Sequence, residues 1–148
     1  MDIIIPYFHI IGIMTLMGAL IAEHLMLKPG IGKPEIKQLA LVDLIYAISV
    51  VIVLATGLLR WFVYGKGNAY YLSNPVFHTK LTLFIILGIL SVVPTIRFIK
   101  WNRQARNGDV PMITDKSASK LLLYIRIELL IVVLIPLLAV MTARGIRF

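Results

Sequence analysis

The sequence predicts an all-α integral membrane protein, folded as an up-down bundle of four transmembrane helices. Three observations predict this class: 59% of the 148 residues are apolar, the mean hydropathy is +0.92, and short charged connectors with Pro or Gly separate four long apolar segments. A helix needs about 20 residues to cross the hydrocarbon core. Backbone groups in lipid must be hydrogen-bonded internally, so segments of this length are expected to be helical.

The four expected spans are residues 3–26, 38–64, 76–99 and 121–143. The first is too long for the core of a signal peptide and has no basic residues before it, so we expect it to stay as a transmembrane helix. The second and third are separated by GKGNAYYLSNP, and the third and fourth by KWNRQARNGDVPMITDKSASK. With no internal repeat and no second domain in the pattern, residues 1–148 are interpreted as one domain with both termini on the same side.

The Lys and Arg residues predict which side that is. Nine lie on the face of the first and third connectors: Lys28, Lys33, Lys37, Arg97, Lys100, Arg103, Arg106, Lys116 and Lys120. Five lie on the opposite face: Arg60, Lys66, Lys80, Arg144 and Arg147. Because basic loops stay in the cytoplasm, we expect a multi-pass protein of the bacterial plasma membrane with both termini outside the cytoplasm.

The net charge of +8 favours membrane lipids over nucleic acid as partner, because the charge lies in short loops beside the spans. The absence of cysteine excludes disulfides, thiolate metal sites and thiol nucleophiles. The chain also contains no Gly-rich phosphate loop, no nucleophile elbow and no HExxH motif. These absences exclude several classes of enzyme, and the residues that are present do not by themselves identify another.

Four basic side chains are expected at a similar depth near the outer side. Arg60 lies near the end of the second span, His78 and Lys80 open the third, and His9 lies about two turns inside the first. Ionisable groups within a bilayer are costly and usually face a bundle interior, a cavity or a ligand. This outer basic cluster is the candidate site, although snorkelling to lipid phosphates would also explain Arg60 and Lys80.

The two outer histidines have more than one interpretation. A buried polar group without a hydrogen-bond partner costs about 1–3 kcal/mol. A histidine that only packs in the interior avoids this cost if its ring nitrogens have partners, so a structural role is one interpretation. Alternatively, His9 and His78 on facing helices ligate the iron of haem b, and Arg60 and Lys80 neutralise its propionates. One axial histidine, with the other as a proton carrier or propionate partner, fits the expected depths equally well.

A second polar cluster is expected in the cytoplasmic half of the bundle. Its members come from all four spans: Glu23, His24, Asp43, Arg97, Arg126 and Glu128. An ion-pair network between helices would explain them, since unpaired charges in hydrocarbon are expensive. The alternative is a proton route or a polar cavity in which Glu23, His24 and Glu128 titrate.

The stretch from Asp43 through GLLRWFVYGKGNAYYLSNPVFHTKLTLF to SVVPTIRFIKW resembles a bacterial family of small predicted membrane proteins of unknown function. More distantly, the layout is similar to HemJ-type protoporphyrinogen oxidases and to copper-resistance D-like membrane domains. His9 in YFHIIGIMTLMGAL and Lys80 in FHTKLTLF match two positions of the HemJ type. That resemblance implies haem b binding and tetrapyrrole oxidation, with His9 as haem ligand, Lys80 as propionate or substrate contact, and electrons passed to the respiratory chain.

Two functional hypotheses follow. The first is a membrane haem protein with oxidoreductase activity, with a quinone or tetrapyrrole as its partner. The second is a noncatalytic module in which the outer basic cluster binds a lipid, an anionic small molecule or a partner helix. Small residues such as Gly18 and Ala22 also provide a surface on which a homodimer could form.

Overall fold

The computed structural model describes residues 2–147, which form five helices. These are α1 (Ile4–Met26), α2 (Lys33–Phe62), α3 (Asn68–Leu72), α4 (Pro75–Arg106) and α5 (Asp115–Ala143). All except α3 are long and apolar enough to cross a membrane. The predicted class, a membrane bundle of four long helices, is therefore confirmed.

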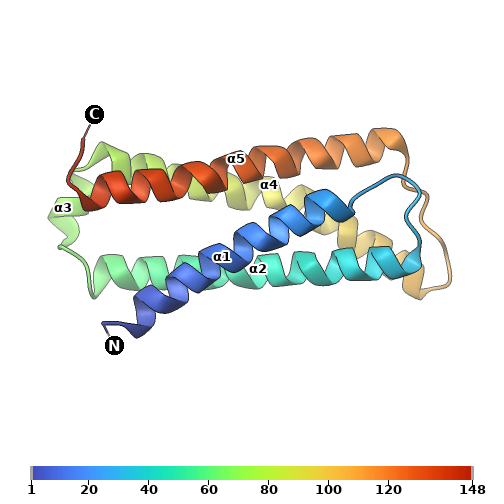
Figure 1. The fold of residues 1–148 in the computed structure, drawn as a ribbon, viewed down its shortest axis with the longest axis horizontal. Coiled ribbons are helices and arrows are strands. Elements are labelled where there is room, and N and C mark those ends of the chain that lie inside the picture. The colour runs from blue at the N-terminus through green and yellow to red at the C-terminus, as the bar shows by residue number, and fades with distance from the viewer. Residues whose placement is uncertain (1, 148) are drawn as a thin grey trace.

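The long helices form two antiparallel hairpins, α1 with α2 and α4 with α5, which pack against each other through α2–α4 and α1–α5 contacts (Figure 1). The helices α1 and α4 are thus diagonal in the bundle, as are α2 and α5. Both chain ends and α3 lie at one end of the bundle (Figure 1), which we call the terminus end. The connections from α1 to α2 and from α4 to α5 lie at the opposite end, which we call the loop end.

The helices extend beyond the apolar spans at the loop end. Helix α2 begins at Lys33, with Pro34 in its first turn, and α4 continues to Arg106. Helix α5 begins after Thr114, whose side chain accepts a hydrogen bond from the Ser117 amide at 3.2 Å. Hydropathy alone located the lipid-facing part of each helix but missed these polar turns, which are stabilised by caps and by charges that complement the helix dipole.

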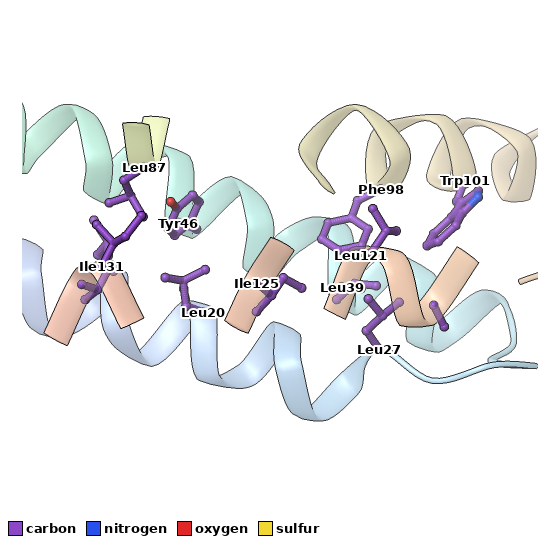
Figure 2. Close-up of a cluster of buried hydrophobic side chains, with 14 of the residues drawn as sticks. Leu20, Leu27, Leu39, Tyr46, Leu87, Phe98, Trp101, Leu121, Ile125 and Ile131 are labelled. Atoms are coloured by element: carbon purple, nitrogen blue, oxygen red, sulfur yellow. The ribbon is translucent and has the colours of Figure 1, made fainter. Parts of the chain in front are cut away.

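The best packed part of the interior lies toward the loop end. Figure 2 shows side chains from all four long helices meeting there, among them Leu20 of α1, Leu39 of α2, Phe98 of α4 and Leu121 of α5, each at most 3% exposed. Leu27, directly after α1, packs with them. Close contact between α1 and α2 depends on Gly12, because a Cβ atom there would lie 2.9 Å from Cγ2 of Val53. The contact at Gly12 lies within the first hairpin, whereas the side chains around Phe98 and Leu121 hold the two hairpins together in the loop half.

The terminus end is held by hydrogen bonds instead of a packed core. The Tyr70 hydroxyl donates to the backbone carbonyl of Thr142 at 2.7 Å, and the Lys66 ammonium donates to that of Ala143 at 3.0 Å. Asn74 caps α4 by accepting from the Val76 amide at 3.0 Å. The segment around α3 is therefore fixed to the end of α5, across the opening between the hairpins.

Candidate functional site

A cavity of about 390 Å³ lies among α1, α2, α4 and α5 at the terminus end, with part of its wall formed by the segment around α3. Its floor, farthest toward the loop end, includes Leu16, Leu87 and Val132, and side chains such as Phe84 and Ile135 line the walls. The volume falls within the range of about 300–1,000 Å³ that is typical of small-molecule sites. An apolar body between helices would fit these walls.

His9 lines this cavity, and its hydrogen bond fixes the state of the ring. Its Nδ1 lies 2.8 Å from the hydroxyl oxygen of Thr56, and that hydroxyl donates to the backbone carbonyl of Ile52 at 2.6 Å. Because the single Thr56 proton is used on the carbonyl, Thr56 must accept the His9 bond, so the proton lies on Nδ1. The Nε2 atom of His9 therefore keeps a free lone pair.

Gly57 makes room for this ring. A Cβ atom at position 57 would lie 3.4 Å from Cε1 of His9, so the imidazole packs directly on the backbone of α2. Gly57 follows Thr56, and the two neighbours thus position the ring by a hydrogen bond and by close contact. Nothing about either residue alone predicts this pairing from the sequence.

Three cations line the cavity: Arg60, Lys66 and Lys80. Arg60 is exposed, whereas Lys80 is half-buried and lies 5.0 Å from the centre of the Phe77 ring. Lys66, which the sequence indicated only as a loop charge, lies 4.8 Å from the Tyr70 ring centre. An anionic group at this level would meet positive charge from α2, α4 and the connector between α2 and α3.

Aromatic side chains line the cavity together with these cations. Trp61 stacks on Phe62 with ring centres 4.4 Å apart and meets Phe77 edge-on at 5.0 Å, and Phe77 also contacts Tyr71 at 5.0 Å. The indole nitrogen of Trp61 is buried and has no hydrogen-bond partner. Trp61, Tyr71 and Phe77 all line the cavity.

His78 is not part of the cavity, so His9 and His78 do not form a pair of facing ligands in this structure. The His78 side chain is exposed, and its Nε2 donates to the backbone carbonyl of Leu72 at 2.8 Å. Residues two apart on a helix are about 200° apart around its axis. Since Lys80 points inward, His78 points outward, and its helix α4 is diagonal to α1.

The six predicted members of the inner cluster separate into two groups. Glu23, Asp43 and Glu128 are buried, at 1%, 4% and 1% exposure. Arg97 and Arg126 are exposed, and the Nε of Arg126 donates to Nε2 of His24 at 3.2 Å. The expected ion pairing of these acids with Arg97 and Arg126 is therefore not formed, because long basic side chains turn outward where a packed interior leaves no room for them.

Asp43 is bound across the helix interface by the Thr95 hydroxyl of α4, which donates to its Oδ1 at 3.0 Å. Within residues 2–147, no group of three or more His, Cys, Asp or Glu side chains has the arrangement of a metal site. The buried acids thus form a cluster of their own, separate from the cavity and from the surface arginines.

The comparison with known families identifies the chain. A family model described as "predicted membrane protein (DUF2214)" matches residues 1–147. This protein belongs to the DUF2214 family. It matches no curated protein and no solved structure. The family description agrees with the four membrane-length helices and names no activity. The cavity and the buried acids are the features of this DUF2214 protein that bear on function.

Proposed function

We propose that this DUF2214 protein binds an anionic amphipathic ligand in the terminus-end cavity, with haem b as the specific candidate and His9 as its axial ligand. The observation that carries the proposal is the 2.8 Å contact between His9 Nδ1 and the Thr56 hydroxyl oxygen, at a histidine that lines the cavity. Because the Thr56 hydroxyl donates to the Ile52 carbonyl, this contact places the ring proton on Nδ1 and leaves Nε2 able to bind a metal. Histidines that ligate metals characteristically donate their other ring N–H to a fixed acceptor. Thr56 supplies such an acceptor here.

The rest of the cavity fits the same class of ligand. Its apolar floor and walls suit a hydrophobic macrocycle, and Arg60, Lys66 and Lys80 suit two carboxylates at the mouth. His9 is the one histidine among the described residues that lines the cavity, so a single axial ligand is proposed in place of two. Bound haem would supply one-electron redox chemistry, which makes an oxidoreductase with a quinone or tetrapyrrole partner the enzymatic form of this proposal.

An absorption spectrum of the detergent-purified protein, oxidised and dithionite-reduced, tests the haem proposal. A Soret band with reduced α and β bands is expected in the wild type and should be lost in His9→Ala. The matched control is His78→Ala, because His78 lies outside the cavity and its removal should leave the bands unchanged. Colourless wild-type protein from haem-replete cells would refute haem binding.

The second candidate is a noncatalytic module that holds an anionic lipid in the same cavity. It is favoured by Arg60, which lines the cavity and is also exposed, as a side chain shared between a ligand and the headgroup region would be. Native mass spectrometry of colourless protein should then show retained anionic lipid that is lost from Arg60→Gln. Retention that is unchanged in Arg60→Gln would contradict this candidate.

We also propose that the terminus end faces away from the cytoplasm of a bacterial cell, on the basis of the nine cations near the loop end. The chain has no cysteine, so single introduced cysteines report topology without background. Asn68→Cys at the terminus end should react with an impermeant maleimide added to intact spheroplasts, and Asn107→Cys at the loop end only after permeabilisation. The reverse labelling pattern would place the cavity on the cytoplasmic side.

A further inference from the structure

Three carboxylic acids from three different helices are buried together in the interior. Glu23 comes from α1, Asp43 from α2 and Glu128 from α5, and each side chain is at most 4% exposed. The Glu23 carboxyl lies beside that of Asp43 and within electrostatic range of that of Glu128. We call Glu23, Asp43 and Glu128 the acid triad.

Among residues 2–147, no cation of the surrounding helices is turned toward the triad. On α1, His24 is occupied by Arg126, and its Nε2 accepts that bond and so carries no proton. On α4, Arg97 is exposed, the Thr95 hydroxyl donates to Asp43 of the triad, and the Ser91 hydroxyl lies near Tyr46 and donates to the backbone carbonyl of Gly88. On α5, Arg126 is exposed. The triad therefore has neutral surroundings.

Tyr46 supplies a second, independent indication that the triad takes a ligand. Its side chain is 2% exposed, points into the interior between Leu20 and Leu87 (Figure 2), and its hydroxyl lies beside the Glu128 carboxyl. Within the described part of the chain, that hydroxyl has no hydrogen-bond partner, and neither has Oε1 of Glu23 or Oε1 of Glu128. Buried polar atoms are normally paired, so three open positions around one site indicate missing hydrogens or a small polar guest.

The charge of the triad identifies that guest. Three ionised carboxylates would place a charge of −3 in the interior of a membrane protein, where even one unpaired charge is expensive. Buried groups in this situation neutralise by taking up protons. Asp43 is the member best able to stay ionised, because it accepts a 3.0 Å hydrogen bond from the Thr95 hydroxyl of a neighbouring helix.

We propose that the acid triad is a proton-binding site that holds two protons at neutral pH, one on Glu23 and one on Glu128, with Asp43 as the single anion. Each added hydrogen turns a carboxyl that could only accept hydrogen bonds into one that also donates. Glu23 then donates to Asp43, and Glu128 and Tyr46 can donate to each other. The triad keeps a net charge of −1.

The triad lies close to the floor of the cavity, so its protons are near any group bound there. Glu128 lies four residues, about one turn, from Val132 in the cavity floor, and Ser91 lies four residues from Leu87 in the same floor. A proton on Glu128 is therefore about one helical turn below any group bound in the cavity, and a proton on Glu23 about two turns below it, because Glu23 lies seven residues from Leu16 in the floor. The proposal does not depend on what that group is, so colourless protein would leave it intact.

Infrared spectroscopy of the purified protein at neutral pH tests the proposal directly. Exposed carboxyls are ionised under these conditions, so only buried protonated acids contribute a carboxylic C=O stretch. Labelling all glutamates with ¹³C at the side-chain carboxyl should shift the whole acid band, because the proposal places both protons on glutamates and none on aspartates. An acid band that does not move on glutamate labelling, or the absence of any acid band, would overturn the proposal without requiring a mutant.

Variants then assign the protons to residues. Glu23→Gln and Glu128→Gln mimic the protonated acids and should each remove one of two glutamate contributions to the band. Glu35→Gln is the matched control, because Glu35 is exposed at the start of α2 and should contribute nothing. Loss of the band in Glu35→Gln, or its survival in the double variant of Glu23 and Glu128, would contradict the assignment.

Discussion

The two ends of this bundle differ in how far their ionisable side chains are buried. At the terminus end, Arg60, Lys66 and Lys80 surround open space and lie within reach of the membrane surface. Toward the loop end, Glu23, Asp43 and Glu128 lie inside a packed interior. The basic groups have long, flexible side chains that can reach water, whereas the acids have short ones that cannot.

This difference follows from packing. In the loop half, large side chains such as Phe98 fill the space between the hairpins, and the acids are enclosed with them. In the terminus half, the hairpins are joined across α3 through hydrogen bonds such as that from Tyr70 to Thr142, and the space between them stays open. The ionisable groups are thus buried where the helices pack closely, and the cavity lies where they do not.

The largest effect is expected from removing a ring in the packed half. Phe98→Ala should lower the free energy of unfolding by about 3–5 kcal/mol, because Phe98 is 1% exposed and its loss leaves a void. Phe84→Ala, in the cavity wall, enlarges a space that already exists and should have a clearly smaller effect. Denaturant titration in detergent measures both, and equal losses would show that the two halves are packed alike.

The next largest effect concerns the residue that holds His9. Thr56→Val removes the acceptor for the His9 Nδ1 proton and should weaken haem affinity about 10–100-fold, as loss of such a supporting group typically does. Haem titration followed by absorbance provides the measurement. Thr82→Val, at an exposed position of α4, is the control. Unchanged affinity in Thr56→Val would remove the main support for His9 as ligand.

A smaller effect is expected from single cavity cations. Arg60→Gln and Lys80→Gln should each weaken binding of an anionic amphiphile about tenfold, because a charge-assisted hydrogen bond from a side chain that is partly open to solvent contributes about 1.5 kcal/mol, the lower end of the usual range. Arg97→Gln removes an exposed cation of α4 far from the cavity and should leave affinity unchanged. Equal weakening in all three variants, measured at one salt concentration, would mean that net charge decides binding and the cavity does not.

The smallest effect separates two glycines of α1. Gly12→Ala should lower the unfolding free energy by about 1 kcal/mol, because its Cβ would meet Cγ2 of Val53 at 2.9 Å. Gly18→Ala, where nothing lies within 4 Å, should raise it by up to about 1 kcal/mol, because alanine is the better helix former. Melting curves of the two variants should therefore move in opposite directions. A destabilised Gly18→Ala would instead indicate that α1 packs against another chain.

Individual residues mark how far the sequence could predict the site. Lys80 and His9 were expected near each other and both line the cavity, because each lies at the predicted depth on its own helix. His78 was grouped with them by depth, yet it faces outward, since depth does not specify rotation about the helix axis. The role of Thr56 as partner of His9 was not predicted, because a threonine in an apolar span has no pattern that distinguishes it from packing.

The amino-acid sequence was sufficient for the membrane class, the four spans and the shared side of the two termini, because these depend on composition along each segment and on connector length. Only the tertiary structure decided that Glu23, Asp43 and Glu128 meet without Arg97 or Arg126, and that His9 faces a cavity lined by three cations. Both arrangements depend on how four helices rotate and tilt against one another. Rotation and tilt are determined by side-chain packing between residues far apart in the chain, and the hydropathy along one helix does not predict them.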